Sequence, residues 1–451
     1  MKNLFDDFES VSSKQWKQQL QFELKGKDYS DTLVWNSPED IKVKPFYHAD
    51  ENIDHAAVAT KCGDFKICQN IFVFDVQKSI ERTKDAIDRG ATAVRFSIEN
   101  PEIDVEKLLT DVDFGNAIIF FNLNFISKFF LDKVNKIAAQ KKLSVHTNLD
   151  PIGYFANDGN WQTKDKNNVF ETIKSIGVAN ISLAINAGLY QQAGANIVQE
   201  LAYAMAQVTE YFEKFETIKN QITFEVAIGS NYFFEIAKLR ALRLLFKTIA
   251  SAYNHDLDCM ILATPSRRNK TIYDYNTNLI RTTSECMSAV LGGANVIANL
   301  PYDSLYHKDN EFGDRLARNQ LLILQQEAYF DKVDNPSDGS YYIESLTNQL
   351  AEKALGLFKE IEKCGGFLQL LNDGTIQKKI AESHIKEQQL FDENKIVLVG
   401  TNKFLNPNDL MKNDLELYPF LKNSISKTVI QPIFEQRLAE KVEQRRLIAE
   451  G

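Results

Sequence analysis

The sequence of 451 residues contains little cysteine and proline, with 5 and 10 residues respectively, and no long apolar run. The cysteines form no CxxC pair and have no regular spacing, which is typical of reduced thiols rather than of a disulfide framework. No stretch approaches the ~18 uninterrupted apolar residues that a membrane-spanning helix needs. Residues 1–20 carry acidic groups and no apolar core, which argues against a secretory signal. We therefore expect a cytoplasmic protein with no membrane partner.

The chain also lacks a surplus of positive charge. Its formal net charge is −9, whereas binding of nucleic-acid phosphates requires an excess of Lys and Arg on some face. The densest basic cluster is Arg267, Arg268 and Lys270, for which a solvated loop is the favoured interpretation over a phosphate site. Phosphate-binding P-loops, dinucleotide-binding GxGxxG turns, HExxH and GxSxG are all missing. No nucleic-acid partner is expected.

Histidine is sparse, and the six residues are scattered along the chain, so we expect no zinc site. His146 follows a predicted strand, and Asp150 could orient its ring. A histidine satisfied by neighbouring polar groups is nevertheless favoured over a catalytic one. The histidines are His48, His55, His146, His255, His307 and His384.

What the sequence does contain is an alternation of short apolar runs and helical patterns. The runs are rich in Ile, Val and Phe and too short for helices, which is typical of buried parallel strands. Eight such runs alternating with helices favour a (β/α)8 TIM barrel over residues 61–330. The runs are 67–74, 93–98, 117–123, 143–148, 181–185, 222–228, 259–263 and 295–300.

The helical segments support this fold. Residues 232–253 place Leu242, Leu245 and Ile249 on one apolar face, and residues 276–291 end at a Gly-Gly pair. A doubly wound open sheet is the alternative, but the turn after residue 74 offers no glycine for its first phosphate-binding loop. Arg95 and Glu225 lie inside predicted strands, where an inward ion pair that plugs the barrel is the favoured interpretation.

Two regions flank the predicted barrel. Residues 1–60 form an N-terminal extension, in which a capping box at Ser12 starts a helix with Trp16, Leu20 and Leu24 in one stripe. That stripe must be buried either on the barrel or on a partner, so we expect a partner-wrapping arm. Residues 331–451 form a C-terminal helical region and linker, ending in a charged helix over 435–450 that we expect to be exposed.

Several ordered blocks resemble the methylmalonyl-CoA mutase family, and together they extend from about residue 5 to about residue 445. They comprise GKDYSDTLVW at 26–35, IKVKPFY at 41–47, AIGSNYFFEIAKLRALRLLF at 227–246, RTTSE at 281–285, VLGG at 290–293, RLARNQLLILQQE at 315–327 and NPSDGSYYIESLT at 335–347. The resemblance implies an adenosylcobalamin-dependent isomerase that interconverts methylmalonyl-CoA and succinyl-CoA. In such enzymes the barrel holds the acyl-CoA, and a separate C-terminal domain holds the cofactor.

The chain departs from the family pattern where chemistry would occur. Catalytic members carry Gly-Tyr-His-Met-Gln-Glu-Ala-Gly-Ala after the fifth strand, and the corresponding stretch 187–195 reads AGLYQQAGA, which places Gly188 and Leu189 at the Tyr and His positions. Asn70 stands where the family has a substrate-facing Tyr. Thr147 aligns with a Gln of the family, although Asn148 leaves that register open. Thr264 begins the stretch that corresponds to the family's Thr-His-Ser-Gln but departs from it. Loss of one donor to the thioester oxygen costs about 3–4 kcal/mol of transition-state stabilisation. We therefore predict no catalytic residues.

The cobalamin signature Asp-x-His-x-x-Gly does not occur either, so this chain is expected to bind no cofactor and no metal. The resemblance then identifies it as a small, non-catalytic subunit in a heterodimer, with adenosylcobalamin in the large catalytic subunit. One alternative is a catalytic acyl-CoA mutase barrel that works with a separately encoded cobalamin domain. Another is a barrel with different chemistry around His146 and Asp150.

Overall fold

A computed structural model describes residues 9–51, 57–163, 166–215, 218–421 and 427–450. Within these residues, eight parallel strands form one sheet in the order β6-β5-β4-β3-β10-β9-β8-β7. The strands are β3 (Lys66–Phe72), β4 (Ala93–Ile98), β5 (Ile118–Leu123), β6 (Ser144–His146), β7 (Ala184–Asn186), β8 (Ile222–Ile228), β9 (Cys259–Pro265) and β10 (Val296–Ile297).

The sheet closes between its first and last strands. Leu149, just after β6, forms a parallel bridge with Leu183, just before β7. The amide of Leu149 donates to the Ser182 carbonyl at 2.9 Å, and the amide of Ala184 donates to the Leu149 carbonyl at 2.9 Å. The prediction of a (β/α)8 barrel is therefore confirmed, and each of the eight predicted runs overlaps one barrel strand.

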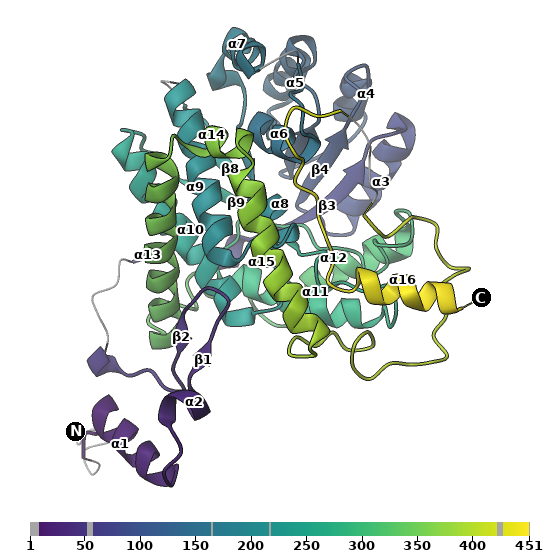
Figure 1. Cartoon of the computed structure of the whole chain (residues 1–451). Helices are drawn as coiled ribbons and strands as arrows, with labels where there is room; N and C mark the ends of the chain where they lie inside the picture. The colour runs from purple at the N-terminus through teal and green to yellow at the C-terminus, as the bar shows by residue number, and fades with distance from the viewer. Residues whose placement is uncertain (1–8, 52–56, 164–165, 216–217, 422–426, 451) are drawn as a thin grey trace, which may run out of the picture.

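Helices cover the outside of the barrel (Figure 1). Outward side chains such as Ile119, Phe224 and Ile261 join the main core beneath these helices, because successive residues of a strand point to opposite faces. The helices between and after the barrel strands are α3 (Val76–Asp88), α4 (Val105–Thr110), α5 (Lys128–Lys141), α6 (Pro151–Asp158), α7 (Lys166–Ile176), α8 (Ala187–Gln192), α9 (Ile197–Lys214), α10 (Tyr232–Ala252), α11 (Thr277–Leu291) and α12 (Glu311–Gln326).

The N-terminal region extends away from the barrel (Figure 1). It contains α1 (Ser13–Glu23), α2 (Tyr29–Leu33) and an antiparallel hairpin of β1 (Trp35–Asn36) and β2 (Lys42–Val43). The predicted capping box is present, since the Gln15 amide donates to Ser12 Oγ and the Ser12 amide donates to Gln15 Oε1. No residue of α1 is buried in this chain. The predicted apolar stripe of α1 is only partly buried: Trp16 stacks on Phe46 with the ring centroids 4.2 Å apart, and Leu20 and Leu24 are partly exposed.

The C-terminal region contains α13 (Tyr341–Lys363), α14 (Phe367–Asn372), α15 (Thr375–Asp392) and α16 (Glu440–Ala449). The prediction that the last charged helix is exposed was wrong for one face. Glu443 is fully buried, accepts a hydrogen bond from the Ile272 amide at 2.9 Å and pairs with Arg437 at 2.7 Å. The described helices include none that is both long and apolar enough to cross a bilayer.

Candidate functional site at the barrel mouth

An ion pair spans the interior of the barrel. Arg95 on β4 donates from Nη1 to Glu225 Oε2 on β8 at 3.0 Å, although four strand-to-strand steps separate β4 from β8 in the sheet. Arg95 Nε also donates to Asn70 Oδ1 at 2.9 Å, and Asn148 Nδ2 donates to Glu225 Oε1 at 3.1 Å. The predicted inward pair is therefore confirmed, and two asparagines extend it into a network.

Apolar side chains fill more of the interior beside this network. Cys68, Phe120, Met260 and Leu262 belong to an inner cluster that is separate from the main core. His146 stacks on the Phe120 ring with the ring centroids 5.1 Å apart. Burial lowers the pKa of His146, which keeps its imidazole neutral at pH 7. Its Nδ1 has no hydrogen-bond partner among the described residues.

Asp150 does not orient His146; its carboxylate holds three helices together instead. It caps α6 through the Gly153 amide at 2.8 Å and accepts from the Asn186 amide at 2.8 Å. Gln207 Nε2 at 2.6 Å and Tyr211 Oη at 2.7 Å, both on α9, donate to Asp150 Oδ1. Burial raises the pKa of Asp150 to about 6, although the hydrogen bonds from Asn186, Tyr211 and Gly153 oppose the shift. The expected pairing of Asp150 with His146 is not seen.

The two positions that correspond to the family's Tyr and His lie at the start of α8. The Leu189 amide donates to the Asn186 side chain at 3.2 Å, and the Leu189 side chain is buried in the main core outside the barrel. A Cβ on Gly188 would lie 3.0 Å from the Ala227 amide nitrogen. Position 188 therefore has no room for a side chain unless α8 moves, and neither residue presents a donor to the mouth.

Thr147 also faces away from the barrel interior. Its Oγ1 accepts from the Ser182 amide at 2.8 Å and so fastens the closing seam of the barrel. Asn148 is the residue that points inward here, with a left-handed φ of 33° that asparagine tolerates better than most residues. Thr264 on β9 follows inward-facing Leu262 by two residues and is partly exposed at the mouth. Of the five predicted positions, only Asn70 and Thr264 thus line the barrel.

A C-terminal segment, residues 429–438, crosses part of the rim. The Ile433 amide donates to the Ala156 carbonyl at 2.8 Å, the Gln436 amide to the Gln192 carbonyl at 2.9 Å, and the Leu438 amide to the Arg268 carbonyl at 3.0 Å. The three acceptors follow β6, β7 and β9, whose carboxyl ends form the face where barrel enzymes keep their chemistry. Figure 1 shows this yellow segment leaving α16 and running up beside α6.

The interpretation of Arg268 and Lys270 as a solvated loop was wrong. Arg268 is buried and donates to Glu387 at 2.7 Å, to the Gln436 carbonyl at 2.8 Å and toward His384 at 2.9 Å. Lys270 is buried and paired with Glu285 at 2.7 Å. The partners of Arg268 lie more than 100 positions away in the sequence, so the local pattern of basic residues did not indicate them. Both side chains hold the rim together.

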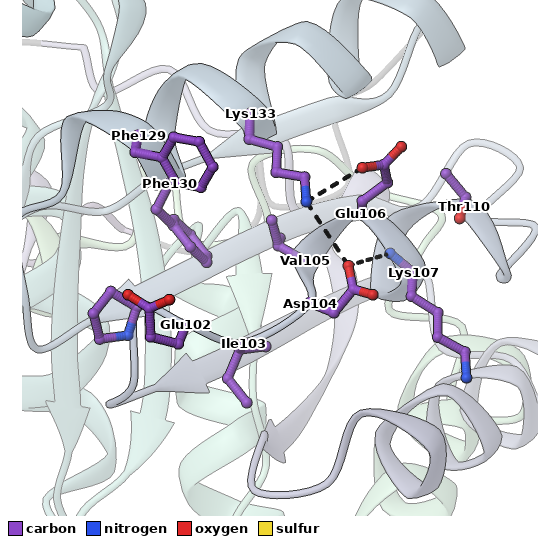
Figure 2. A pocket seen from close by; sticks show the side chains of 11 residues that line it. Glu102, Ile103, Asp104, Val105, Glu106, Lys107, Thr110, Phe129, Phe130 and Lys133 are labelled. Carbon is purple, nitrogen blue, oxygen red and sulfur yellow. Dashed lines mark hydrogen bonds and ion pairs between the residues drawn. The ribbon is translucent and has the colours of Figure 1, made fainter.

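A surface pocket of about 450 Å³ lies between the loop after β4 and the start of α4 and α5. Figure 2 shows Lys133 reaching across it to Glu106 at 3.2 Å and Asp104 at 3.9 Å. Phe129 lines the pocket and is largely exposed. None of the predicted site residues lines this pocket, which is separate from the ion pair inside the barrel.

A closed βα barrel with an ion pair across its interior, a degenerate mouth and an N-terminal arm defines the class of this protein. The sequence profile described as methylmalonyl-CoA mutase matches residues 100–446. The chain is 32% identical, over 99% of its length and 78% of the relative's, to the methylmalonyl-CoA mutase small subunit of Porphyromonas gingivalis. The chain therefore belongs to the methylmalonyl-CoA mutase family.

Other relatives match a smaller share of their own length. The methylmalonyl-CoA mutase of Rhizobium meliloti is 37% identical over 49% of this chain and 33% of the relative. The methylmalonyl-CoA mutase large subunit of Porphyromonas gingivalis is 33% identical over 51% of this chain and 33% of the relative. The chain thus matches about a third of the length of these two proteins.

Proposed function

We propose that this chain is a small, non-catalytic subunit of a methylmalonyl-CoA mutase, and that it stabilises a large catalytic subunit in a heterodimer. The observation that carries the proposal is the ion pair across the barrel, together with the absence of donors at positions 188 and 189. Its similarity to a small subunit over 99% of its length supports the same assignment.

The filled interior supports a loss of substrate binding. An acyl-CoA held in the barrel, as the family resemblance implies, would compete for space with Arg95, Glu225 and the Phe120 ring. The Arg95 and Glu225 side chains are only 14% and 13% exposed, so separating them would leave poorly solvated charges. Catalysis would also lack a hydrogen-bond donor to the thioester oxygen at two positions, which is worth about 10²–10³ in kcat for each donor.

We propose that this chain does not hold adenosylcobalamin. No histidine of the chain lies in Asp-x-His-x-x-Gly, the signature that the family resemblance gives for the residue that binds cobalt. The rings of His48, His146 and His255 stack on phenylalanines, His307 lies between two carboxylates, and His384 contacts Arg268. We therefore propose that the cofactor belongs to the large subunit.

The N-terminal arm supports a protein partner. Val11, Phe22 and Trp35, all within this arm, are 54%, 81% and 48% exposed, and apolar side chains that gather on one part of a surface mark interaction sites. Small and large mutase subunits both occur in Porphyromonas gingivalis, and both are similar to this chain. We propose that α1 and its neighbours pack on the large subunit.

A cytoplasmic location is part of the proposal, supported by five free cysteines.

Co-purification tests this assignment. The full chain, a variant lacking residues 9–24 and a matched variant with Lys14 and Lys17 changed to Gln would each be mixed with a candidate large subunit. We expect the full chain and the Lys variant to co-elute with it and to slow its thermal inactivation, whereas the deletion does neither. Mutase turnover by this chain with a separate cobalamin domain, in the absence of any large subunit, would support the alternative of a split catalytic enzyme.

A further inference from the structure

The hairpin of β1 and β2 attaches the N-terminal arm to the barrel through its turn. Ser37, Glu39 and Ile41 are buried, with 7%, 8% and 1% of their surface exposed, although the strand residues Trp35 and Asn36 are exposed. The Pro38 carbonyl accepts from Asn196 Nδ2, at the start of α9, at 3.2 Å. The Ser37 hydroxyl accepts from the amides of Glu39 and Ile41 and shapes the turn. Docking therefore inserts the Glu39 side chain into the protein.

Glu39 enters a group of buried charges on α9 and α10. Lys238 Nζ contacts Glu235 Oε2 at 2.6 Å, Glu200 Oε2 at 3.0 Å and the Ala227 carbonyl at 2.6 Å. The side chains of Lys238, Glu200 and Glu235 are 1%, 1% and 4% exposed. Glu39 lies within electrostatic range of Glu235, and its Oε2 has no hydrogen-bond partner among the described residues.

The charges of this group do not balance. Two carboxylates, those of Glu200 and Glu235, contact the one ammonium, and buried Glu39 adds a third carboxylate beside Glu235. Full ionisation would therefore bury a net charge of about −2 in a dry site, which is strongly unfavourable. Glu285 lies within electrostatic range of Glu235, and Lys270 neutralises Glu285 at 2.7 Å. On the outer side, Asp40 is 99% exposed and pairs with Lys353 of α13 at 3.4 Å. Neither pair supplies the missing positive charge.

The directions of the pKa shifts agree with this geometry. Burial raises the pKa of Glu39, and hydrogen bonds from Ser37 and the Ile197 backbone reduce that rise. Burial likewise raises the pKa of Glu200, with Lys238 opposing the shift. Burial alone would lower the pKa of Lys238, but Glu200 and Glu235 raise it, which favours the charged ammonium.

We propose that docking of the β1–β2 hairpin takes up a proton from solvent into the cluster of Glu39, Glu200, Glu235 and Lys238. An undocked Glu39 is solvated and ionises near pH ~4.3. Because the docked state binds more protons, docking is strongest below that pH and weakens as the pH rises through the raised pKa of the docked cluster. One proton corresponds to about a tenfold change in the docking equilibrium per pH unit inside that window. The inference concerns this chain alone and does not rest on the proposed partner.

Hydrogen–deuterium exchange of the backbone amides of residues 35–43 tests the proposal on the full chain between pH 5.5 and 8.5, after correction for intrinsic exchange rates. We expect protection of the wild-type hairpin to fall by up to about tenfold per pH unit. Glu39→Gln is expected to stay protected across the range, because its neutral side chain needs no proton. Asp40→Asn, the matched control one residue away, is expected to follow the wild type.

Glu200→Gln gives a second, independent perturbation, since it removes one carboxylate without touching the hairpin. It is expected to flatten the pH dependence as Glu39→Gln does. Wild-type protection that does not change with pH, or an unchanged slope in both variants, would overturn the proposal. A third result would also overturn it: Glu39→Gln loses protection at every pH, and Glu200→Gln keeps the wild-type pH dependence. Glu39 would then hold the hairpin only as an ionised group.

Discussion

Replacing Arg95 with methionine removes the guanidinium from the barrel and leaves Glu225 with a hydrogen bond from Asn148. At 3.0 Å, opposite charges attract by about 5.5 kcal/mol at an effective dielectric constant of about 20. Part of that attraction offsets the cost of desolvating both groups, and each side chain keeps some contact with water. We therefore expect Arg95→Met to lower the free energy of unfolding by about 3 kcal/mol.

A double-mutant cycle measures this quantity without assuming what each side chain contributes alone. Urea unfolding, followed by far-UV circular dichroism, would compare the wild type with Arg95→Met, Glu225→Leu and the double variant. We expect the double variant to be about 2 kcal/mol more stable than the sum of the single changes implies, because it leaves no unpaired charge in the barrel. A cost below about 1 kcal/mol for each single change, or simple additivity, would refute the idea that this pair fills the barrel as a unit.

Three further predictions concern the site and its rim. Gly188→Ala should lower the unfolding free energy by about 1–3 kcal/mol, because its Cβ would lie 3.0 Å from the Ala227 nitrogen. Gly356→Ala is the control, since a Cβ there would have no neighbour within 4 Å. Equal effects of the two changes would contradict the packing argument. Thr147→Val should lower the free energy of unfolding by about 1–3 kcal/mol, because it leaves the Ser182 amide unpaired. Thr264→Val at the mouth should lower it by under about 0.5 kcal/mol in the same urea titration. Burial alone would lower the pKa of His307, but Asp303 and Asp414 raise it, so its stabilising charge is present at acidic pH and lost as the pH rises through that raised value. A His307→Gln variant should accordingly show a flatter stability profile than the wild type between pH 6 and 8, and parallel profiles would contradict this.

The barrel was predictable because parallel strands that are buried on both faces leave an uninterrupted apolar signature. The runs at 93–98 and 222–228 match β4 and β8 at both ends. The runs at 181–185 and 295–300 are less well matched, since β7 and β10 cover only Ala184–Asn186 and Val296–Ile297. Few residues of these two strands form regular backbone pairs. Next to β7, the hydrogen bond from the Ser182 amide to Thr147 Oγ1 takes the place of a backbone pair.

The inward ion pair was predictable for a similar reason. A charge within a strand that is buried on both faces needs an opposite charge nearby, and Arg95 and Glu225 were the available pair. Asn148 was not chosen over Thr147, because the alternation of a strand fixes which face a residue occupies only while the backbone stays extended. At Asn148 the φ of 33° breaks that alternation, and no periodic pattern in the sequence signals the break.

Contacts between distant segments could not be predicted. Arg268 and Glu387 are separated by 119 positions, and the Ile272 amide lies 171 positions from Glu443. The segment 429–438 has no helical or strand periodicity, so nothing local indicated that it crosses the rim. Buried charges of this kind are identified by their partners, which only the folded chain brings together.

Turnover by a reconstituted complex tests most directly whether this barrel has a catalytic role. The large subunit would carry an inactivating change at its own Tyr-His motif, and conversion of methylmalonyl-CoA would be followed with adenosylcobalamin present. We expect such a complex to assemble normally but to show no turnover above the level without protein. Turnover that persists in that complex, and disappears when this chain's own mouth is altered at Asn70 and Thr264, would contradict it.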